Sequence, residues 1–197
     1  MNTAIFKSVY TIPIIRIANR LIGVLYLKNN ILIYSLASEE NIKRIKESRG
    51  RVKDTASERY KNYTNLINNM ELHKGEKVVD PGNYIKYDSV KKNPQKVSII
   101  IGRNGGSAAE LFALAALQSK KVLLFGENTA GAGDNLDAYP FDLNCSFYFA
   151  NIPISKRIQE VYRHPIDNIG IPPKIKIPQK TDPLSFILKY YGIDYKP

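Results

Sequence analysis

The hydrophobic and polar positions of this 197-residue chain change period several times along its length. Residues 38–53 carry apolar side chains at Ile42 and Ile45 behind a serine that can cap a helix, so they predict a polar helix. A second helix is expected over residues 56–72, where apolar side chains recur every three or four positions. These side chains are Tyr60, Tyr63, Leu66, Ile67 and Met70.

The middle of the chain predicts a strand, a helix and a second strand in that order. Residues 97–101 (VSIII) form the continuous apolar run that is typical of a strand buried on both faces. An alanine- and leucine-rich helix is expected over residues 107–119, and residues 121–125 (KVLLF) predict the next strand. Because this order normally produces a parallel crossover, we expect an α/β fold.

Outside these segments the hydrophobic pattern predicts the elements less clearly. Residues 8–36 are rich in Ile, Leu, Val and Tyr and predict extended structure, although Pro13 argues against a central strand. Further elements are expected as a strand over residues 147–152, a short edge strand over 175–177, and a helix over 182–191 with Asp182 as cap and Pro183 at its first position.

Length and composition suit one globular domain, because 44% of the residues are hydrophobic. The net charge of +11 is spread along the chain, which favours a solvated basic surface and no nucleic-acid partner. A nucleic-acid-binding module is the alternative, and it predicts an affinity that falls steeply with salt. The apolar run near the N-terminus is broken by Pro13, Arg16 and Arg20, so neither a membrane span nor a signal peptide is expected.

Metal-binding residues are scarce. Cys145 is the single cysteine, and the histidines are His73 and His164, so no ligand spacing is present and we expect no metal and no cofactor. Cys145 lies in an apolar stretch that is typical of a buried, inert thiol. His73 follows a predicted helix, where a histidine complements the helix dipole.

Ser107 stands where the first buried strand becomes a helix, directly after Gly105 and Gly106. Backbone N–H groups at a helix start point outward and can hold a developing negative charge, so Ser107 is a candidate acyl-transfer nucleophile. The run Ser-Ala-Ala-Glu also matches a capping box closed by Glu110. A cap alone does not need the two glycines, which let a ligand approach the backbone closely.

Four motifs in fixed order resemble one family: NGGSAAELFALAALQ, KVLLFGENTAGAG, DNIGIPPKIKI and DPLSFILKYY. Together they are similar to the tail-specific (carboxy-terminal processing) serine peptidases, and most similar to the tricorn-core-like, Bacteroidetes-type branch. The resemblance is best over residues 97–191. It implies a ClpP/crotonase-like fold, a single catalytic domain over residues 1–197, and hydrolysis of peptide bonds through an acyl-enzyme.

The resemblance also implies roles for individual residues. Ser107 would be the nucleophile, the N–H of Ala108 an oxyanion donor, and Asp167 the acidic partner. The peptide groove would be shaped by Gly105, Gly106, Gly131 and Gly133. Such grooves often bind an extended peptide by strand addition, so the expected partner is a peptide or protein substrate.

This chain departs from the family pattern at several points. Ala132 stands where the lysine-using branch has its lysine, and Lys174 replaces a family aspartate. No segment matches the D-x-R-x-N-x-G-G turn or the family's general-base histidine, so the chain resembles the C-terminal part of such a peptidase. His164, three residues before Asp167, is a candidate base, and an ordinary loop histidine is the alternative interpretation.

Two alternatives therefore stay open for the whole chain, an active peptidase and a truncated or degenerate remnant that binds peptide without cleaving it. Without a base, a serine hydroxyl is a poor nucleophile at neutral pH. The pattern sets neither the oligomeric state nor the location of this chain, whereas the resemblance implies that complete relatives usually lie outside the cytoplasm.

Overall fold

The computed structural model describes residues 3–7, 28–29, 33–80, 85–86, 91–143, 148–158 and 164–194. The chain divides into two compact units. The first unit consists of Met1–Asn29, Lys86–Gly133 and Val161–Pro197, and the second of Asn30–Ile85 and Asp134–Glu160. The organisation of residues 1–197 as one domain stays a prediction, because each unit is described by itself.

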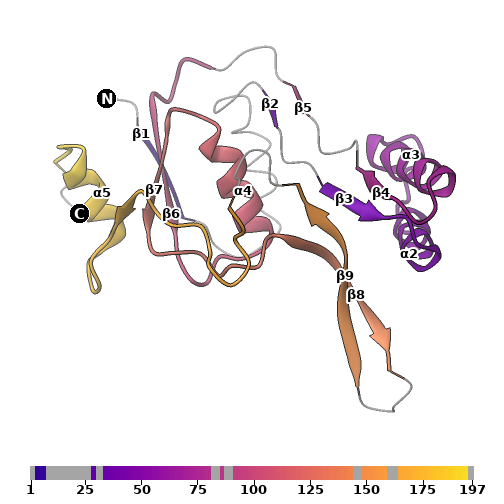
Figure 1. Cartoon of the computed structure of the whole chain (residues 1–197). Helices are drawn as coiled ribbons and strands as arrows, with labels where there is room; N and C mark the ends of the chain where they lie inside the picture. Colours follow the sequence, from indigo (N-terminus) through magenta and orange to yellow (C-terminus); the bar gives the residue numbers. More distant parts are fainter. Residues whose placement is uncertain are drawn as a thin grey trace. The chain divides into compact units, whose positions relative to one another are not determined.

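The first unit is built on a four-stranded sheet in the order β1-β6-β7-β10 (Figure 1). Its strands are β1 (Thr3–Lys7), β6 (Lys96–Ile101), β7 (Val122–Gly126) and β10 (Ile175–Lys176). Every neighbouring pair is parallel, which confirms the predicted crossover between β6 and β7. Strand β10, predicted over residues 175–177, lies at the edge of the sheet as expected. The pattern did not predict β1.

The two central strands of this sheet hold the core of the first unit. Val97 and Ile99 of β6 are fully buried, as are Leu124 and Phe125 of β7, which confirms strands that are covered on both faces. Helix α4 (Ala108–Leu117) connects the two strands. Its small side chains include the fully buried Ala113, so α4 can pack closely against the sheet.

The last helix of the first unit, α5 (Pro183–Tyr190), begins at the predicted residue. The carboxylate of Asp182 accepts a hydrogen bond from the N–H of Ser185 at 2.7 Å, which caps the helix. At its other end, the rings of Tyr190 and Tyr191 contact Phe125 edge-on, with centroids 5.3 and 6.2 Å away. These contacts fix the end of α5 to the core.

The second unit contains an antiparallel sheet in the order β4-β3-β9-β8 and two helices (Figure 1). Its elements are β3 (Ile33–Leu36), α2 (Glu39–Gly50), α3 (Glu58–Leu72), β4 (Lys77–Val79), β8 (Asn135–Asp142) and β9 (Phe149–Arg157). A separate two-stranded sheet is formed by β2 (Lys28–Asn29), which belongs to the first unit, and β5 (Ile85–Lys86), which spans the boundary between the units in the sequence. The predicted apolar stripes of α2 and α3 form the core, with Ile42, Ile45, Leu66, Ile67 and Met70 all buried.

The structure corrects the sequence prediction in the second unit. Helix α3 begins at Glu58 behind the capping serine Ser57, two residues later than expected. Strand β8 was not predicted, and β9 continues to Arg157 rather than ending at residue 152. The two strands pair with each other, and β9 also pairs with β3, and a local pattern does not contain this long-range pairing.

Other predictions meet different outcomes. His73 is the C-cap residue of α3, as expected, and its Nδ1 lies 3.2 Å from a carboxylate oxygen of Glu76. Cys145 and residues 8–27 lie outside the described residues. No helix in the described part of the chain has the length and apolar character needed to cross a membrane.

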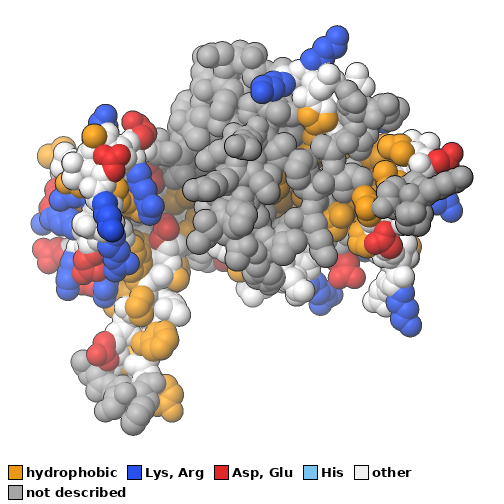
Figure 2. Space-filling model, turned by 180° about the vertical axis from the view of Figure 1, so that it is seen from behind, with side chains coloured by type: hydrophobic (Ala, Val, Ile, Leu, Met, Phe, Trp, Pro, Cys, Tyr) orange, Lys and Arg blue, Asp and Glu red, His pale blue; other side chains and the backbone are white. Residues whose placement is uncertain are grey.

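Charged side chains of both signs are interspersed over α2 and α3 on the face shown in Figure 2. Arg44 pairs with Glu40 and Glu47, and Lys46 with Glu71. Mixed charges of this kind are typical of a solvated surface. The absence of a nucleic-acid partner stays a prediction.

Candidate active site

Ser107 occupies a strained turn between β6 and α4. It is the N-cap residue of α4, and its backbone has φ +53°. This left-handed conformation costs a residue with a Cβ roughly 1–2 kcal/mol, so the surrounding contacts must hold it in place. Ser107 is exposed, which is what a nucleophile approached by a substrate carbonyl requires.

Glu110 caps α4 from within the helix. Its carboxylate accepts a hydrogen bond from the N–H of Ser107 at 3.0 Å, which is the carboxylate half of the predicted capping box. The N–H of Glu110 donates to the carbonyl oxygen of Ser107 at 2.9 Å, and both halves of the predicted capping box are present. A hydroxyl oxygen that accepts a cap hydrogen bond still carries an O–H that can donate.

The Glu110 carboxylate also binds the glycine-rich loop. It is fully buried and accepts hydrogen bonds from the N–H groups of Gly131 at 2.7 Å and Ala132 at 2.8 Å, and from the hydroxyl of Thr129. A buried carboxylate is tolerated only when such donors replace its hydration. Through this carboxylate the loop is held against the turn that carries Ser107.

Thr129 connects the same carboxylate to a third segment. Its buried hydroxyl accepts a hydrogen bond from the N–H of Ile171 at 2.7 Å, and its own N–H donates to the Ile171 carbonyl at 3.2 Å. The N–H of Asn168 donates to the carbonyl of Gly131 at 2.9 Å. The turn that contains Asp167 is therefore joined to the loop that contacts Glu110.

Close packing explains two of the glycines in the loop. Gly131 has φ +79°, and a Cβ there would lie 2.8 Å from the backbone oxygen of Ile166. A Cβ on Gly133 would lie 2.6 Å from the Ile166 side chain and 3.1 Å from the Glu110 carboxylate. Both positions therefore exclude a side chain for reasons internal to this cluster. The role of Gly131 and Gly133 in a peptide groove stays a prediction.

Ala108 is the first residue of α4 and is exposed beside Ser107. The N–H groups of a first helical turn have no acceptor within the helix, so this N–H can donate to an oxyanion. Gly105 donates its N–H to the Gly102 carbonyl at 2.8 Å, and its carbonyl accepts from Ala130 at 2.9 Å. Gly106 packs against Ala130, since a Cβ there would lie 3.1 Å from the alanine Cβ.

His164 is exposed and Asp167 is half-buried, on either side of the fully buried Ile166. The N–H of Gly170 donates to the Ile166 carbonyl at 2.7 Å, which closes this turn. The structure therefore presents both candidate polar groups from one ordered turn of the first unit. Their roles as base and acidic partner stay predictions.

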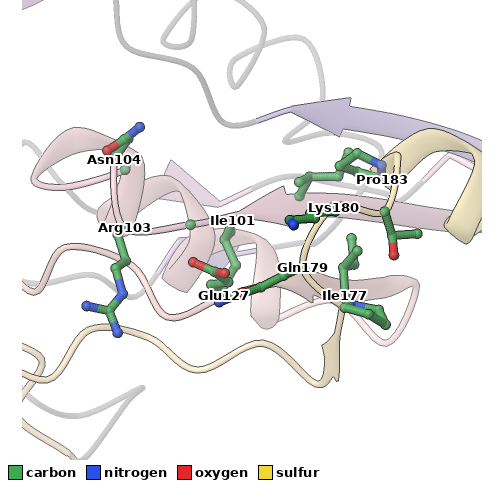
Figure 3. Close-up of a pocket in the computed structure, with 14 residues that line it drawn as sticks. Ile101, Arg103, Asn104, Glu127, Ile177, Gln179, Lys180 and Pro183 are labelled. Carbon is green, nitrogen blue, oxygen red and sulfur yellow. The ribbon is translucent and has the colours of Figure 1, made fainter.

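Two adjoining cavities lie at the carboxyl ends of β6 and β7, with volumes of about 440 and 730 Å³. Figure 3 shows residues that line the smaller one. Both are lined by Arg103, Gly126, Glu127, Ile177 and Gln179. Among the described residues, no group of three or more His, Cys, Asp or Glu side chains could hold a metal ion.

Sequence reasoning missed three residues of this region. The sequence predicted Glu110 only as a local cap, placed Thr129 in a loop without a partner for its hydroxyl, and gave Arg103 no role. The threonine inside a glycine-rich loop was an available signal for Thr129, because a small hydroxyl can donate and accept at once. An arginine two residues after the end of a buried strand was the signal for Arg103.

A family comparison identifies the class of protein. The model of peptidase family S41 matches residues 29–177, which is more than half of the chain. The chain belongs to this family, and the predicted membership of the tail-specific peptidases is confirmed. No curated protein matches the chain.

Solved structures show the fold. The structure of mature CPAF complexed with lactacystin has a TM-score of 0.60 at 14% identity, covering 90% of this chain and 40% of that one. Mature CPAF alone has a TM-score of 0.58 at 14% identity, with coverages of 90% and 39%. The photosystem II D1 C-terminal processing protease has a TM-score of 0.46 at 16% identity, with coverages of 98% and 39%. The chain thus spans about two fifths of these structures, and its α/β fold is of the ClpP/crotonase-like type.

Proposed function

We propose that this chain is part of a serine-type peptidase that hydrolyses peptide bonds through an acyl-enzyme on Ser107. Membership of the S41 family supports the class of reaction. The observation that carries the assignment to one residue is the exposed Ser107 at the start of α4, held at φ +53°. An ordinary N-cap serine has an extended backbone, as Ser38 and Ser57 do, whereas Ser107 does not.

The first step would join Ser107 Oγ to the carbonyl carbon of the substrate. The hydroxyl proton passes to a base, the carbonyl oxygen becomes an oxyanion, and the Ala108 N–H donates to it. Collapse of this intermediate breaks the C–N bond, and the amine leaves with the proton from the base. Water then attacks the Ser107 ester and releases the acid. His164 is the proposed base and Asp167 its acidic partner.

The proposed substrate is an extended peptide or a protein segment. Gly105 and Gly106 precede the nucleophile and carry no side chain that would obstruct a chain bound beside it. Edge strand β10 of the parallel sheet offers a place where an extended segment can pair.

A fluorophosphonate probe tests this proposal, because it labels serine hydroxyls that act as nucleophiles. We expect labelling of the intact chain that is abolished in Ser107→Ala. The matched control is Ser185→Ala, which removes another exposed serine in the first turn of a helix, α5, and leaves labelling unchanged. Circular dichroism of both variants verifies that they fold.

A folded chain that takes up no probe would contradict a catalytic Ser107 and favour the peptide-binding alternative. Labelling that survives in Ser107→Ala would place the nucleophile elsewhere. Loss of labelling in His164→Ala, with folding retained, would support the proposed base. Unchanged labelling of that variant would remove His164 from the mechanism.

A further inference from the structure

The two cavities at the strand ends form one continuous region, which we call the strand-end cavity. They share five lining residues and lie where β6 and β7 end and beside β10. In open α/β sheets, ligands bind at the carboxyl ends of the strands. The two volumes of about 440 and 730 Å³ lie within the range of small-molecule and peptide side-chain sites.

The charged residues of this cavity are unbalanced. Of the residues that the structure describes, Arg103, Lys176 and Lys180 line it, against the single carboxylate of Glu127. Within the described part of the chain, no ion pair joins any of these four side chains to another residue. Three cations and one anion leave a positive excess that favours a negatively charged ligand.

The cationic side chains come from separate segments, as Figure 3 shows for Arg103 on the loop after β6 and Lys180 on the turn after β10. The turn of residues 178–181 is closed by the Thr181 N–H, which donates to the Pro178 carbonyl at 3.2 Å. Lys180 has φ +63° within it. A non-glycine residue in this region costs roughly 1–3 kcal/mol, and such strain is found preferentially at functional sites.

The cavity adjoins the segment that carries the candidate nucleophile. Arg103 and Gly105 line it and precede Ser107 by four and two residues. Gly105 is joined to Ala130, a lining residue of the larger cavity, by a backbone hydrogen bond of 2.9 Å. A ligand held here would therefore contact the loops that fix Ser107.

We propose that the strand-end cavity binds a carboxylate of the peptide substrate and that Arg103 is the residue that selects it. A guanidinium can bind a carboxylate through two parallel hydrogen bonds, which a lysine cannot do. Lys176 and Lys180 add positive charge, and the apolar Ile101 and Ile177 cover the carbon atoms beside the carboxylate. The inference rests on the proposed function, since it takes the ligand to be a peptide.

The carboxylate can come from the C-terminus of a peptide or from an aspartate or glutamate side chain. Three fluorescent peptides of one neutral sequence separate these sources. The first has a free C-terminal carboxylate, the second a C-terminal amide, and the third an amide together with one internal glutamate. Binding is measured by fluorescence polarisation with the full chain carrying Ser107→Ala, so that no peptide is cleaved.

We expect the fully neutral peptide to bind more weakly than at least one of the charged peptides, by about tenfold. Arg103→Gln should remove this preference, and Arg103→Lys should keep part of it, because a point charge remains. The matched control is Arg51→Gln, which removes the same charge from an exposed arginine of the second unit. It should leave all three affinities within about twofold.

Equal binding of all three peptides, or an unchanged preference in Arg103→Gln, would overturn the assignment. Equal losses of affinity for the charged peptides in Arg103→Gln and Arg51→Gln would overturn the assignment too, because the preference would then follow from net charge alone. This experiment does not depend on catalysis. A chain that prefers carboxylate peptides through Arg103 but takes up no fluorophosphonate would retain the subsite and lose the proposed peptidase activity.

Discussion

Two acidic residues are buried in the described part of the chain, and their surroundings differ completely. Glu110, in the first unit, is surrounded by neutral donors: three backbone N–H groups and one hydroxyl. Asp134, in the second unit, is paired with Arg157, whose Nε lies 3.0 Å from a carboxylate oxygen and whose Nη2 contacts the same oxygen. Each carboxylate has its charge compensated, one by dipoles and one by a cation.

The difference follows from what each carboxylate holds together. Glu110 binds the turn of Ser107 and the glycine-rich loop, which donate to it through backbone N–H groups and the hydroxyl of Thr129. Asp134 precedes β8 and Arg157 ends β9, so the ion pair joins the two strands at one end of their hairpin. Backbone N–H groups hold the Ser107 turn against Glu110 without a second charge beside it, whereas the Asp134–Arg157 pair joins two strands through opposite charges.

Removing the guanidinium of Arg157 should have the largest effect on the free energy of unfolding. Arg157→Met leaves the Asp134 carboxylate buried without its guanidinium, and we expect a loss of about 3–5 kcal/mol in the free energy of unfolding. Urea titration followed by far-ultraviolet circular dichroism measures it. The double variant Asp134→Leu with Arg157→Met should recover much of the loss, because both charges are then gone. A single variant within about 1 kcal/mol of wild type would show that the pair contributes little.

Glu110→Gln should have the next largest effect. Its amide nitrogen would face N–H donors, so hydrogen bonds to a charged acceptor are lost, and we expect a cost of about 1.5–3 kcal/mol. Fluorophosphonate labelling of Ser107 should slow as well, because the Ser107 N–H loses its acceptor. Glu58→Gln, an exposed glutamate of the second unit, is the control. Normal labelling together with reduced stability would separate Glu110 from the positioning of Ser107.

Thr129→Val tests the connection between Glu110 and Ile171 at nearly constant volume. It removes one donor from the carboxylate and the acceptor of the Ile171 N–H, and we expect a loss of about 1–3 kcal/mol. The control is Thr64→Val, whose hydroxyl donates to a carbonyl within helix α3 at 3.0 Å. That variant should change stability by about 0.5 kcal/mol or less. Similar losses in both variants would contradict a special role for Thr129.

Removing the exposed carboxylate of Glu71 should have the smallest effect on stability. The hydrogen bond from Lys46, at 2.6 Å, lowers the pKa of Glu71 below its usual value of 4.5. Because the folded-state pKa is the lower one, the contribution of Glu71 is present above pH 4.5 and is lost as the pH falls through the folded-state pKa. The Tm of wild type should therefore exceed that of Glu71→Gln slightly at pH 7, with the difference vanishing in acid. A difference that is independent of pH would exclude this cause.

Local signals were sufficient for much of the fold. Ser38 and Asp182 cap α2 and α5 as their side-chain chemistry predicts, and the apolar run 97–101 gives a strand buried on both faces. These features depend on residues within one or two turns of each other, so their pattern is visible in the sequence. The motifs around Ser107 and Asp167 likewise indicated the family.

Long-range pairing was not visible in the pattern. Strand β1 forms beside β6 although their partners Thr3 and Lys96 are far apart in the sequence, and β8 forms only by pairing with β9. Two of the N–H groups that donate to the Glu110 carboxylate belong to residues about twenty positions later, where the glycine-rich loop folds back. No local property of either segment specifies that approach.

The sequence by itself therefore determined the helices, the caps at Ser38 and Asp182, the buried strands, the family, and the candidate nucleophile Ser107. Only the tertiary structure decided that Glu110 joins the Ser107 turn to the glycine-rich loop, and that three cationic side chains gather at the strand ends. The physical reason is that caps and periodicity act between neighbouring residues. The compensation of a buried charge, in contrast, depends on which distant backbone groups the fold brings within hydrogen-bond distance.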